Sequence, residues 1–193
     1  MATDLDLNLP TAPPLPLRRF SVEQYHQLGE LGVLTPEDNV ELLEGWIVEK
    51  MNQRPIHGFI VGVLTEFFQS VLPNGLSLRC QLPISTDRSE PEPDIAIVQG
   101  SHADFRTRHP DGNDCRLVIE VADTSLIKDR SKVQIYRDAG VQEYWIINVN
   151  DKCLEQHLFS DSPSISTVHD CDNSVTIKLG DANVTLDLTK LFS

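Results

Sequence analysis

The sequence predicts an α/β fold that combines helices with parallel and antiparallel strands. The clearest sign is a βαβ unit, in which an apolar strand over residues 115–121 precedes a helix over 125–139 and an apolar strand over 143–149. Such a unit implies a parallel pair of strands joined by a right-handed crossover. The further signs are an amphipathic helix over residues 56–72 and a turn-rich, alternating segment over 152–187, which is typical of short antiparallel strands.

Length and charge limit the number of domains and the class of partner. The chain has 193 residues and a formal net charge of −13, and its length fits one domain with a real core. Residues 1–17 are rich in proline, so we expect a disordered or surface-draped arm there and a single domain over residues 18–193. The acidic balance argues against a protein that coats nucleic acid by bulk electrostatics.

The sequence also predicts the compartment. No apolar run reaches the ~18 residues that a membrane-spanning helix needs, and the N-terminus lacks the basic region of a secretory signal. The four cysteines are far apart and show no paired spacing typical of a zinc or redox site. We therefore expect a cytoplasmic protein with reduced thiols and no membrane contact.

The first half of the chain is expected to hold two helices, a hairpin and a strand. A capping box at Ser21 and Gln24 opens the first helix. Glu44-Gly45 between two β-rich stretches favours a tight hairpin over an amphipathic helix broken at Gly45. The predicted elements, in order, are a helix from Ser21 to about Leu31, a turn at 35–38, a hairpin over 40–51, the helix over 56–72 and a strand over 76–85.

The second half is expected to contain the βαβ unit and the C-terminal strands. Its strand over 115–121 is interrupted by Arg116 and Glu120 alone, and such a run suits a strand covered on both faces. We expect Phe67, Phe68 and Trp145 in the core rather than as stacking platforms for bases. The predicted elements, in order, are a strand over 92–98, a polar loop over 99–114, the strand, helix and strand of the βαβ unit, and the short strands of the tail.

Carboxylates at the ends of apolar strands are the strongest sign of chemistry. Glu120 interrupts a predicted central strand, where an unpaired carboxylate is costly, so it is ion-paired, protonated or bound to a metal. Asp94 follows a proline at the start of another apolar strand, where an aspartate also commonly caps a turn. With a third acid, Glu41 or its competitor Glu44, these side chains offer the oxygen ligands that Mg²⁺ prefers.

The helix of the βαβ unit carries a polar face. Asp129, Lys132 and Tyr136 share that face because their spacing is helical, and Lys128 joins it four residues before Lys132. A lysine that projects toward the strand-end carboxylates would stabilise negative charge on a phosphate or orient water. The alternative is a solvated face with Asp129–Lys132 ion pairs. We expect Asp129 and Arg130 to be solvated and Tyr136 to pack in the core.

His57 lies in the first turn of its predicted helix. It could act as a proton shuttle or contact a phosphate near the helix N-terminus, but we favour a partly exposed histidine without a special role. Other signatures of catalysis do not occur in the sequence: there is no glycine-rich phosphate loop, serine nucleophile elbow or zinc spacing. Nucleotide-hydrolase and serine-hydrolase functions are therefore disfavoured.

The candidate acids occur in the order of a known nuclease motif. Pro93-Asp94 followed by Glu120-Val121-Ala122 matches PD-(D/E)XK, except that Ala122 stands where the superfamily has lysine. The wider segments that carry the resemblance are Glu41-Leu42-Leu43-Glu44-Gly45, His57 with its helix, Pro93–Val98, Leu117–Val121, and Gly140–Trp145 with the preceding Asp129, Lys132 and Tyr136. Over about residues 20–160 the chain therefore resembles the restriction endonuclease domain family, a branch of the restriction-endonuclease-like superfamily.

This resemblance implies a fold and a set of site residues. The fold would be a mixed sheet flanked by helices, with a nuclease-like core over 20–160 and a C-terminal β extension over 151–193. A site dependent on Mg²⁺, with Mn²⁺ as a substitute, would lie at the strand ends. The residues carried over are Asp94 and Glu120 as motif carboxylates, Glu41 as the N-terminal acid and third metal ligand, Lys132 as a catalytic lysine moved onto the helix, and His57, Glu44 and Tyr136 as accessory candidates.

The same resemblance implies an activity. A nuclease of this family would hydrolyse phosphodiester bonds of nucleic acid, with DNA as the expected substrate. A homodimer is expected because cutting both strands needs two sites, and the apolar strands of the tail could supply its interface. The alternative is a catalytically degenerate nuclease-fold protein that acts as a binding or structural module, for which the net charge and Ala122 argue.

Overall fold

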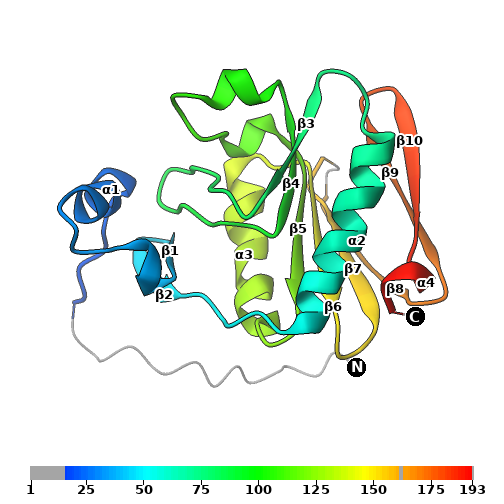
Figure 1. Ribbon diagram of the computed structural model, residues 1–193, viewed down its shortest axis with the longest axis horizontal. Helices are drawn as coiled ribbons and strands as arrows, with labels where there is room; N and C mark the ends of the chain where they lie inside the picture. The colour runs from blue at the N-terminus through cyan, green and yellow to red at the C-terminus, as the bar shows by residue number, and fades with distance from the viewer. Residues whose placement is uncertain (1–15, 161–162, 193) are drawn as a thin grey trace.

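The computed structural model describes residues 16–160 and 163–192 (Figure 1). Its centre is a six-stranded sheet in the order β3-β4-β5-β6-β7-β8. Strands β5 and β6 run parallel, and the other neighbours in this order run antiparallel. The strands are β3 (Leu76–Cys80), β4 (Ile95–Gln99), β5 (Cys115–Ala122), β6 (Glu143–Asn148), β7 (Cys153–Leu158) and β8 (Ile165–Asp170). The predicted mixed α/β fold and its βαβ unit are confirmed.

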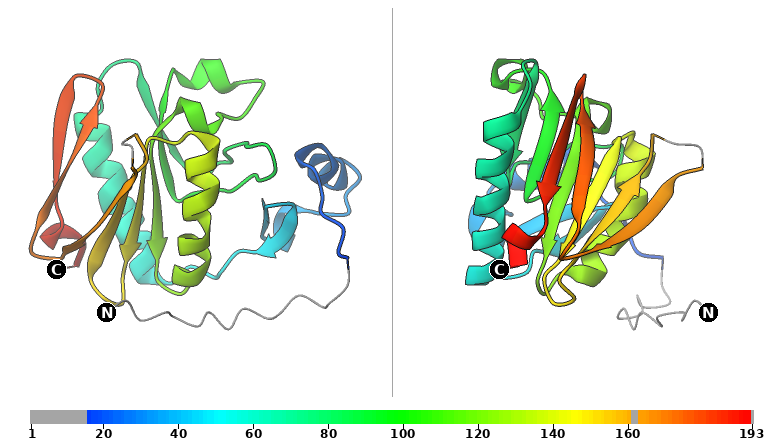
Figure 2. Two further views of the ribbon diagram at one scale, coloured as in Figure 1. Left: turned by 180° about the vertical axis from the view of Figure 1, so that it is seen from behind. Right: turned by 90° about the vertical axis from the view of Figure 1, so that its right-hand side faces the viewer.

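Different elements cover the two faces of the sheet (Figures 1 and 2). Helix α2 (Pro55–Val71) covers one face together with a hairpin of β9 (Ser174–Leu179) and β10 (Ala182–Asp187) and with the short helix α4 (Thr189–Phe192). Helix α3 (Leu126–Ala139) covers the other face. Two separate apolar cores result, one on each side of the sheet.

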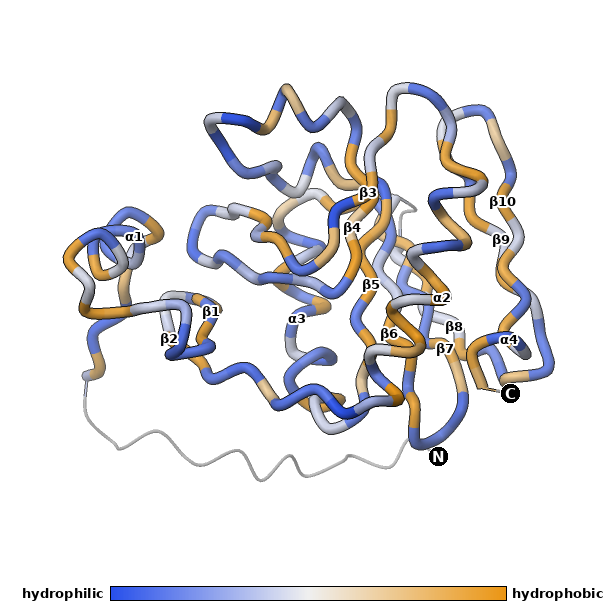
Figure 3. The backbone as a smooth tube through the Cα atoms, viewed as in Figure 1, coloured by the Kyte–Doolittle hydropathy of each residue, from blue (hydrophilic) through white to orange (hydrophobic). Residues whose placement is uncertain are grey.

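Strand β5 divides its side chains between the two cores, because successive side chains of a strand point to opposite faces. Leu117, Ile119 and Val121 belong to the α2 side, and Val118 and Ala122 belong to the α3 side. The strand is thus covered on both faces, as predicted, and hydrophobic colour dominates the central strands in Figure 3. The same alternation points the side chain of Glu120, which lies between Ile119 and Val121, toward α3.

The aromatic residues expected in the core lie there. Phe68 and Trp145 are fully buried on the α2 side, and Phe67 packs against the same cluster. Their rings contact one another, with centroid distances of 5.1 Å for Phe67–Phe68 and 6.2 Å for Phe68–Trp145. They stabilise the packing of α2 on the sheet.

The N-terminal elements form a separate small unit beside the sheet (Figure 1). Helix α1 (Val22–Glu30) has the predicted capping box at Ser21 and Gln24, and a short 3₁₀ turn, Pro36–Asp38, follows it. Strands β1 (Val40–Leu43) and β2 (Trp46–Glu49) form the predicted hairpin. Its turn has positive φ at both Glu44 and Gly45, which matches a tight hairpin turn.

Two strands are shorter than the sequence predicts. Strand β3 ends at Cys80 instead of residue 85, because Gln81 adopts φ 50° and leaves the extended conformation. Strand β4 begins at Ile95 instead of residue 92, because Pro93 has no N–H to donate to a neighbouring strand. The expected loop over 99–114 also contains two 3₁₀ turns, His102–Phe105 and Gly112–Asp114.

The C-terminal part contains the expected antiparallel strands, in two groups. Strands β7 and β8 extend the central sheet, whereas β9 and β10 pair with each other; α4 was not predicted. The apolar side chains of β9 and β10 are buried against α2 and the sheet. Those side chains are therefore part of the chain's own core. The expected dimer interface on the tail strands stays a prediction.

Two further predictions concern the N-terminal arm and the lack of a membrane-spanning helix. The expected arm over residues 1–17 falls almost entirely on residues 1–15, which lie outside the described residues. In the part of the chain that is described, no helix combines the length and the apolar character needed to span a membrane.

Candidate active site

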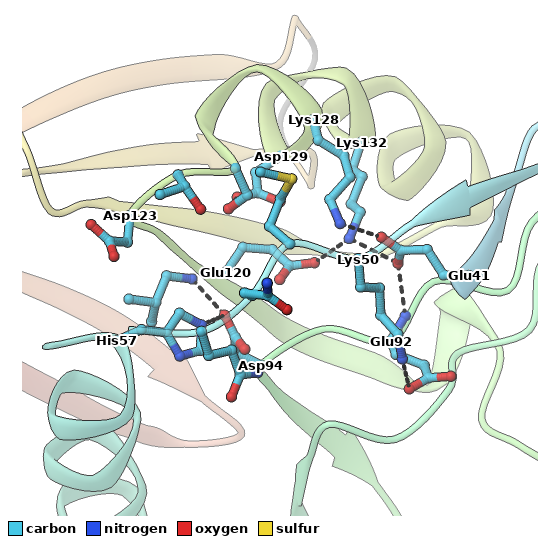
Figure 4. A pocket seen from close by; sticks show the side chains of 16 residues that line it. Glu41, Lys50, His57, Glu92, Asp94, Glu120, Asp123, Lys128, Asp129 and Lys132 are labelled. Carbon is cyan, nitrogen blue, oxygen red and sulfur yellow. Dashed lines mark hydrogen bonds and ion pairs between the residues drawn. The ribbon is translucent and has the colours of Figure 1, made fainter. Parts of the chain in front are cut away.

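A polar cleft lies where β5 ends and α3 begins, and elements from the whole first two thirds of the chain meet there (Figure 4). The hairpin β1–β2, the connection from β2 to α2, the first turn of α2, the segment before β4 and the polar face of α3 all line it. Its ionisable residues are Glu41, Lys50, His57, Glu92, Asp94, Glu120, Asp123, Lys128, Asp129 and Lys132.

Asp94 is fixed by two hydrogen bonds to one of its oxygens. Its Oδ2 accepts the backbone N–H of Val121 at 2.8 Å and contacts His57 Nε2 at 2.9 Å. Because β4 and β5 are neighbours, the residue just before β4 lies beside the end of β5. The second oxygen, Oδ1, has no hydrogen-bond partner in the described chain and is open to the cleft.

Glu120 also commits one oxygen and leaves the other open. Its Oε1 accepts Lys132 Nζ at 2.8 Å and the Tyr136 hydroxyl at 3.3 Å. Its Oε2 makes no hydrogen bond within the described residues. Burial raises the pKa of Glu120 well above its ordinary value, and the negative charge of Asp129 and Asp94 adds to this against the opposing effect of Lys132.

Lys132 is a buried ammonium between two carboxylates. Its Nζ lies 2.8 Å from Glu120 Oε1 and 3.0 Å from Glu41 Oε2, while its side chain is 2% exposed. Burial alone would lower its pKa, but Glu120 and Glu41 outweigh burial and raise it. Lys132 therefore keeps its positive charge, which is tolerated in the interior because both partners are close.

Glu41 joins the cleft from strand β1 and holds both lysines of α3. Its Oε1 lies 2.9 Å from Lys128 Nζ, and its Oε2 contacts Lys132 Nζ and accepts the backbone N–H of Glu92 at 3.2 Å. Burial would raise the pKa of Glu41, but Lys132 and Lys128 outweigh it and lower the pKa. The competitor Glu44 lies outside the cleft, at the hairpin turn, where its carboxylate is half-exposed.

Two expectations about solvated residues are wrong. His57 is buried instead of partly exposed, because α2 packs its first turn against Asp94. Its pKa is raised: burial would lower it, but the hydrogen bond and charge of Asp94 outweigh burial. Asp129 is buried instead of solvated, because α3 turns this side chain toward the cleft, where Ser125 donates a hydrogen bond to it. Burial raises the pKa of Asp129.

The predictions for Tyr136 and Arg130 on α3 agree with the structure. Tyr136 packs in the core as expected, with its ring centroid 4.8 Å from that of Tyr144. Arg130 lies near the surface, where it pairs with Glu155 at 2.6 Å. The structure therefore brings together Glu41, Asp94, Glu120, Lys132 and His57, places Tyr136 behind Glu120, and leaves Glu44 outside.

Sequence reasoning missed three charged residues that line the cleft and the arginine that binds one of them. Lys50 Nζ pairs with Glu92 Oε2 at 2.6 Å, and Arg54 binds both oxygens of Asp123. Both pairs tie the connection between β2 and α2 to neighbouring segments, and Figure 4 shows the Lys50–Glu92 pair. Glu92 and Asp123 stand within three residues of the motif acids, which was the available signal, but their cations are more than forty positions away in sequence.

The expected trio of metal ligands does not converge on one point. Within the described residues, no three or more His, Cys, Asp or Glu side chains come close enough together to hold a metal ion. Lys132 lies between Glu41 and Glu120, so Glu41 faces lysines. The open oxygens of Asp94 and Glu120 nevertheless line the same cleft. Because Mg²⁺ commonly binds one or two protein carboxylates and keeps several waters, these two residues fit such an ion.

A mixed sheet with helices on both faces, with two carboxylates at the strand ends and a lysine from α3 beside them, defines a nuclease-like α/β protein. The comparisons with known proteins agree. The chain belongs to the Uma2 family, described as "putative restriction endonuclease", whose model matches residues 22–167. This confirms the resemblance found in the sequence. A search of curated proteins finds no match.

A solved structure shares the fold over most of its length. It is the crystal structure of a protein from Anabaena variabilis ATCC 29413 described as "a putative nuclease belonging to DUF820". The identity is 16%, the TM-score is 0.70, and the match covers 90% of this chain and 97% of that chain. At this identity the similarity supports the fold alone.

Proposed function

We propose that this protein is a Mg²⁺-dependent endonuclease that hydrolyses phosphodiester bonds of DNA. The observation that carries the proposal is the placement of the Lys132 ammonium 2.8 Å from Glu120, in a cleft shared with Asp94. Membership of the Uma2 family supports the reaction class. A buried cation beside strand-end carboxylates is suited to a reaction in which negative charge grows on a phosphate.

Asp94 and Glu120 would hold the metal ion through their open oxygens, with Mn²⁺ able to replace Mg²⁺. When bound, such an ion supplies a more acidic water and stabilises the leaving oxygen. The Val121 N–H and His57 both bond to the other oxygen of Asp94. These bonds fix the orientation of the carboxylate, so its open oxygen points in one direction. Fixed ligands of this kind lower the cost of organising the site.

Lys132 and Glu41 have different roles in this proposal. Lys132 neutralises charge that develops on the scissile phosphate and helps to position the attacking water. Glu41 acts through the lysines, since its two oxygens contact Lys132 and Lys128. Tyr136 donates to Glu120 from the core side and fixes the rotation of that carboxylate.

The substrate and assembly form the second part of the proposal. Duplex cleavage requires chemistry on both strands, which a two-fold homodimer would supply with two clefts. A chain with a net charge of −13 attracts DNA poorly through bulk charge. Binding would therefore depend on divalent metal and decrease with added salt.

A second candidate function is metal-free binding by a degenerate site. The observation that favours it is the ion pairing of Lys132 with both Glu41 and Glu120, together with Ala122 at the usual lysine position. In that case the carboxylates and lysine would stabilise the fold, and the protein would bind nucleic acid without cleaving it.

A cleavage assay separates the two functions. Supercoiled and linear DNA are incubated with wild type, Asp94→Asn and Glu120→Gln in Mg²⁺, Mn²⁺ or EDTA. Glu66→Gln serves as the control because this acid is exposed on α2. We expect cleavage in Mg²⁺ to fall by at least about 100-fold in both site variants, and to be unchanged in the control. Cleavage retained in both site variants contradicts the proposal; DNA binding in EDTA without any cleavage supports the degenerate site.

A further inference from the structure

A second cleft lies at the other end of the central sheet, on the face covered by α2. The loop after α2, the turn between β9 and β10, and the ends of β4 to β7 surround it. Figure 1 shows the C-terminal end of α2 and the β9–β10 turn at the end of the sheet away from the start of α3. Its volume is about 920 Å³, within the range of small-molecule sites. The polar residues used below are Gln99, Arg116, Glu143, Gln156 and Lys178.

Glu143 lies at the floor of this cleft and is 8% exposed. As the first residue of β6, it shares a face with Trp145. Its Oε1 accepts Trp145 Nε1 at 2.5 Å and Gln156 Nε2 at 2.6 Å, and His169 Nε2 contacts Gln156 Oε1 at 2.8 Å. These contacts fix one oxygen in place. The other, Oε2, has no hydrogen-bond partner in the described chain and faces the cleft.

The charge of this carboxylate is not compensated by the described protein. No Lys or Arg there forms an ion pair with Glu143, and burial raises its pKa. Arg116 and Lys178 lie on the rim, and the Arg116 guanidinium donates to Gln99 instead. A buried carboxylate without a cation is costly, and a carboxylate with a perturbed pKa in a cleft is a frequent mark of a ligand site.

We propose that this second cleft binds a small organic ammonium, whose charged group donates to Glu143 Oε2. A single open oxygen suits an ammonium, which is a compact point charge, better than a guanidinium, which prefers to contact both oxygens of a carboxylate. The remaining space and the polar rim accommodate the body of the ligand. The site is separate from the candidate active site and does not depend on nuclease activity.

Trp145 provides a reporter for this site. Its indole N–H donates to Glu143, so a cation on the opposite oxygen alters that hydrogen bond and shifts the indole N–H resonance. The chain has two tryptophans, and Trp46 in the β1–β2 hairpin is the internal reference. The full-length protein is titrated with n-butylammonium chloride, with uncharged n-butanol as the matched probe, at constant ionic strength.

We expect butylammonium to shift the Trp145 resonance saturably, to leave Trp46 unchanged, and to bind at least about 10-fold more weakly to Glu143→Gln. This substitution keeps an oxygen that can accept from Trp145. Glu66→Gln should behave as wild type. The absence of a saturable shift, an equal response to butanol, or a shift retained in Glu143→Gln would overturn the proposal. If that variant does not fold, the comparison of the two probes on wild type decides.

Discussion

At the residue scale, Lys132 links three parts of the chain that are distant in sequence. Its ammonium contacts Glu41 from the N-terminal hairpin and Glu120 from the central sheet, and all three side chains are buried. Both carboxylates are largely shielded from water. Glu120 pairs with Lys132 alone among the described cations, and Glu41 pairs with Lys132 and Lys128. The stability of the protein and the chemistry of the cleft therefore rest on the same side chain.

Replacement of Lys132 should show this dependence directly. Lys132→Met keeps most of the volume but leaves two buried carboxylates with less compensation, so we expect a loss of ~3–5 kcal/mol in the free energy of unfolding. The double variant Lys132→Met with Glu120→Gln should lose less than the sum of the single variants, because one uncompensated charge is removed as well. Urea unfolding measures all three.

Lys190→Met, an exposed lysine on α4, is the control for this series. It should change the free energy of unfolding by no more than ~0.5 kcal/mol. Strictly additive losses in the double variant would show that Lys132 and Glu120 are not coupled, which contradicts the geometry.

Glu143 gives a pH dependence with a definite sign. Burial raises its pKa in the folded state, so this residue favours folding most at pH values below its unfolded pKa. That contribution is lost as the pH rises through the folded pKa. Glu143→Gln, which carries no charge, should therefore gain stability relative to wild type over the pH range that starts at about pH 4, near the ordinary pKa of glutamate. A constant difference across that range, measured by urea unfolding, would rule out the buried charge as its cause.

At the element scale, the β1–β2 hairpin matters because it carries Glu41 to the lysines of α3. Its turn is restricted at Gly45, which has φ 80°, and a Cβ there would lie 2.7 Å from Arg19 Cβ and 2.9 Å from the Phe20 carbonyl oxygen. Backbone atoms cannot move aside easily. The position of Glu41 thus depends on a residue outside the cleft.

Gly45→Ala should disturb both the hairpin and the cleft. We expect a loss of ~1–3 kcal/mol in stability and a further loss of cleavage activity per folded molecule, because Glu41 no longer holds Lys128 and Lys132 in place. Gly75→Ala is the matched control: Gly75 has φ 87° but nothing within 4 Å of a new Cβ. It should lose stability and keep its activity per folded molecule. Equal effects on activity would contradict this role of the hairpin.

Most elements could be predicted from local patterns, and the errors have identifiable physical causes. Helix α1 follows from its capping box, α2 from its apolar spacing, and β5 from a nearly continuous apolar run. The end of β3 depends on one backbone torsion at Gln81, which a polar side chain does not reveal. Helix α4 is four residues long, too short to show a period.

The candidate site could be predicted in part. Asp94, Glu120 and Glu41 follow from carboxylates beside apolar strands and from the family resemblance, Lys132 follows from the polar face of its helix and the same resemblance, and all four share one cleft. The burial of His57 and Asp129 could not be predicted, because it depends on how α2 and α3 pack beside the end of β5. The pairs Lys50–Glu92 and Arg54–Asp123 join residues far apart in sequence, and no local spacing indicates such contacts.

At the scale of the whole molecule, net charge determines how a substrate is bound. The chain carries −13, and the cleft contains several acids beside its lysines. A polyanionic substrate approaches this surface favourably only when cations bridge it. The Asp94→Asn variant, which we expect to lose cleavage, should bind DNA weakly in both EDTA and Mg²⁺. The Glu41→Gln variant should bind DNA in Mg²⁺.

Binding by fluorescence anisotropy at several salt concentrations tests this expectation. The affinity of Glu41→Gln in Mg²⁺ should fall as sodium chloride is raised, since phosphate contacts release counterions. Equal affinity of the two variants in EDTA and in Mg²⁺ would show that metal does not bridge the DNA.

The most direct test of the central claim is calorimetric titration of Mn²⁺ into wild type and Asp94→Asn, each with and without a short DNA duplex. Our account predicts binding to wild type that is lost in the variant, because Asp94 and Glu120 each present to the cleft an oxygen without a hydrogen-bond partner in the described chain. The duplex is included because Mg²⁺-type sites often complete their coordination with substrate phosphates. Folded wild type that binds no Mn²⁺ even with DNA present, or equal binding by Asp94→Asn, would contradict the assignment of this cleft as a metal-dependent nuclease site.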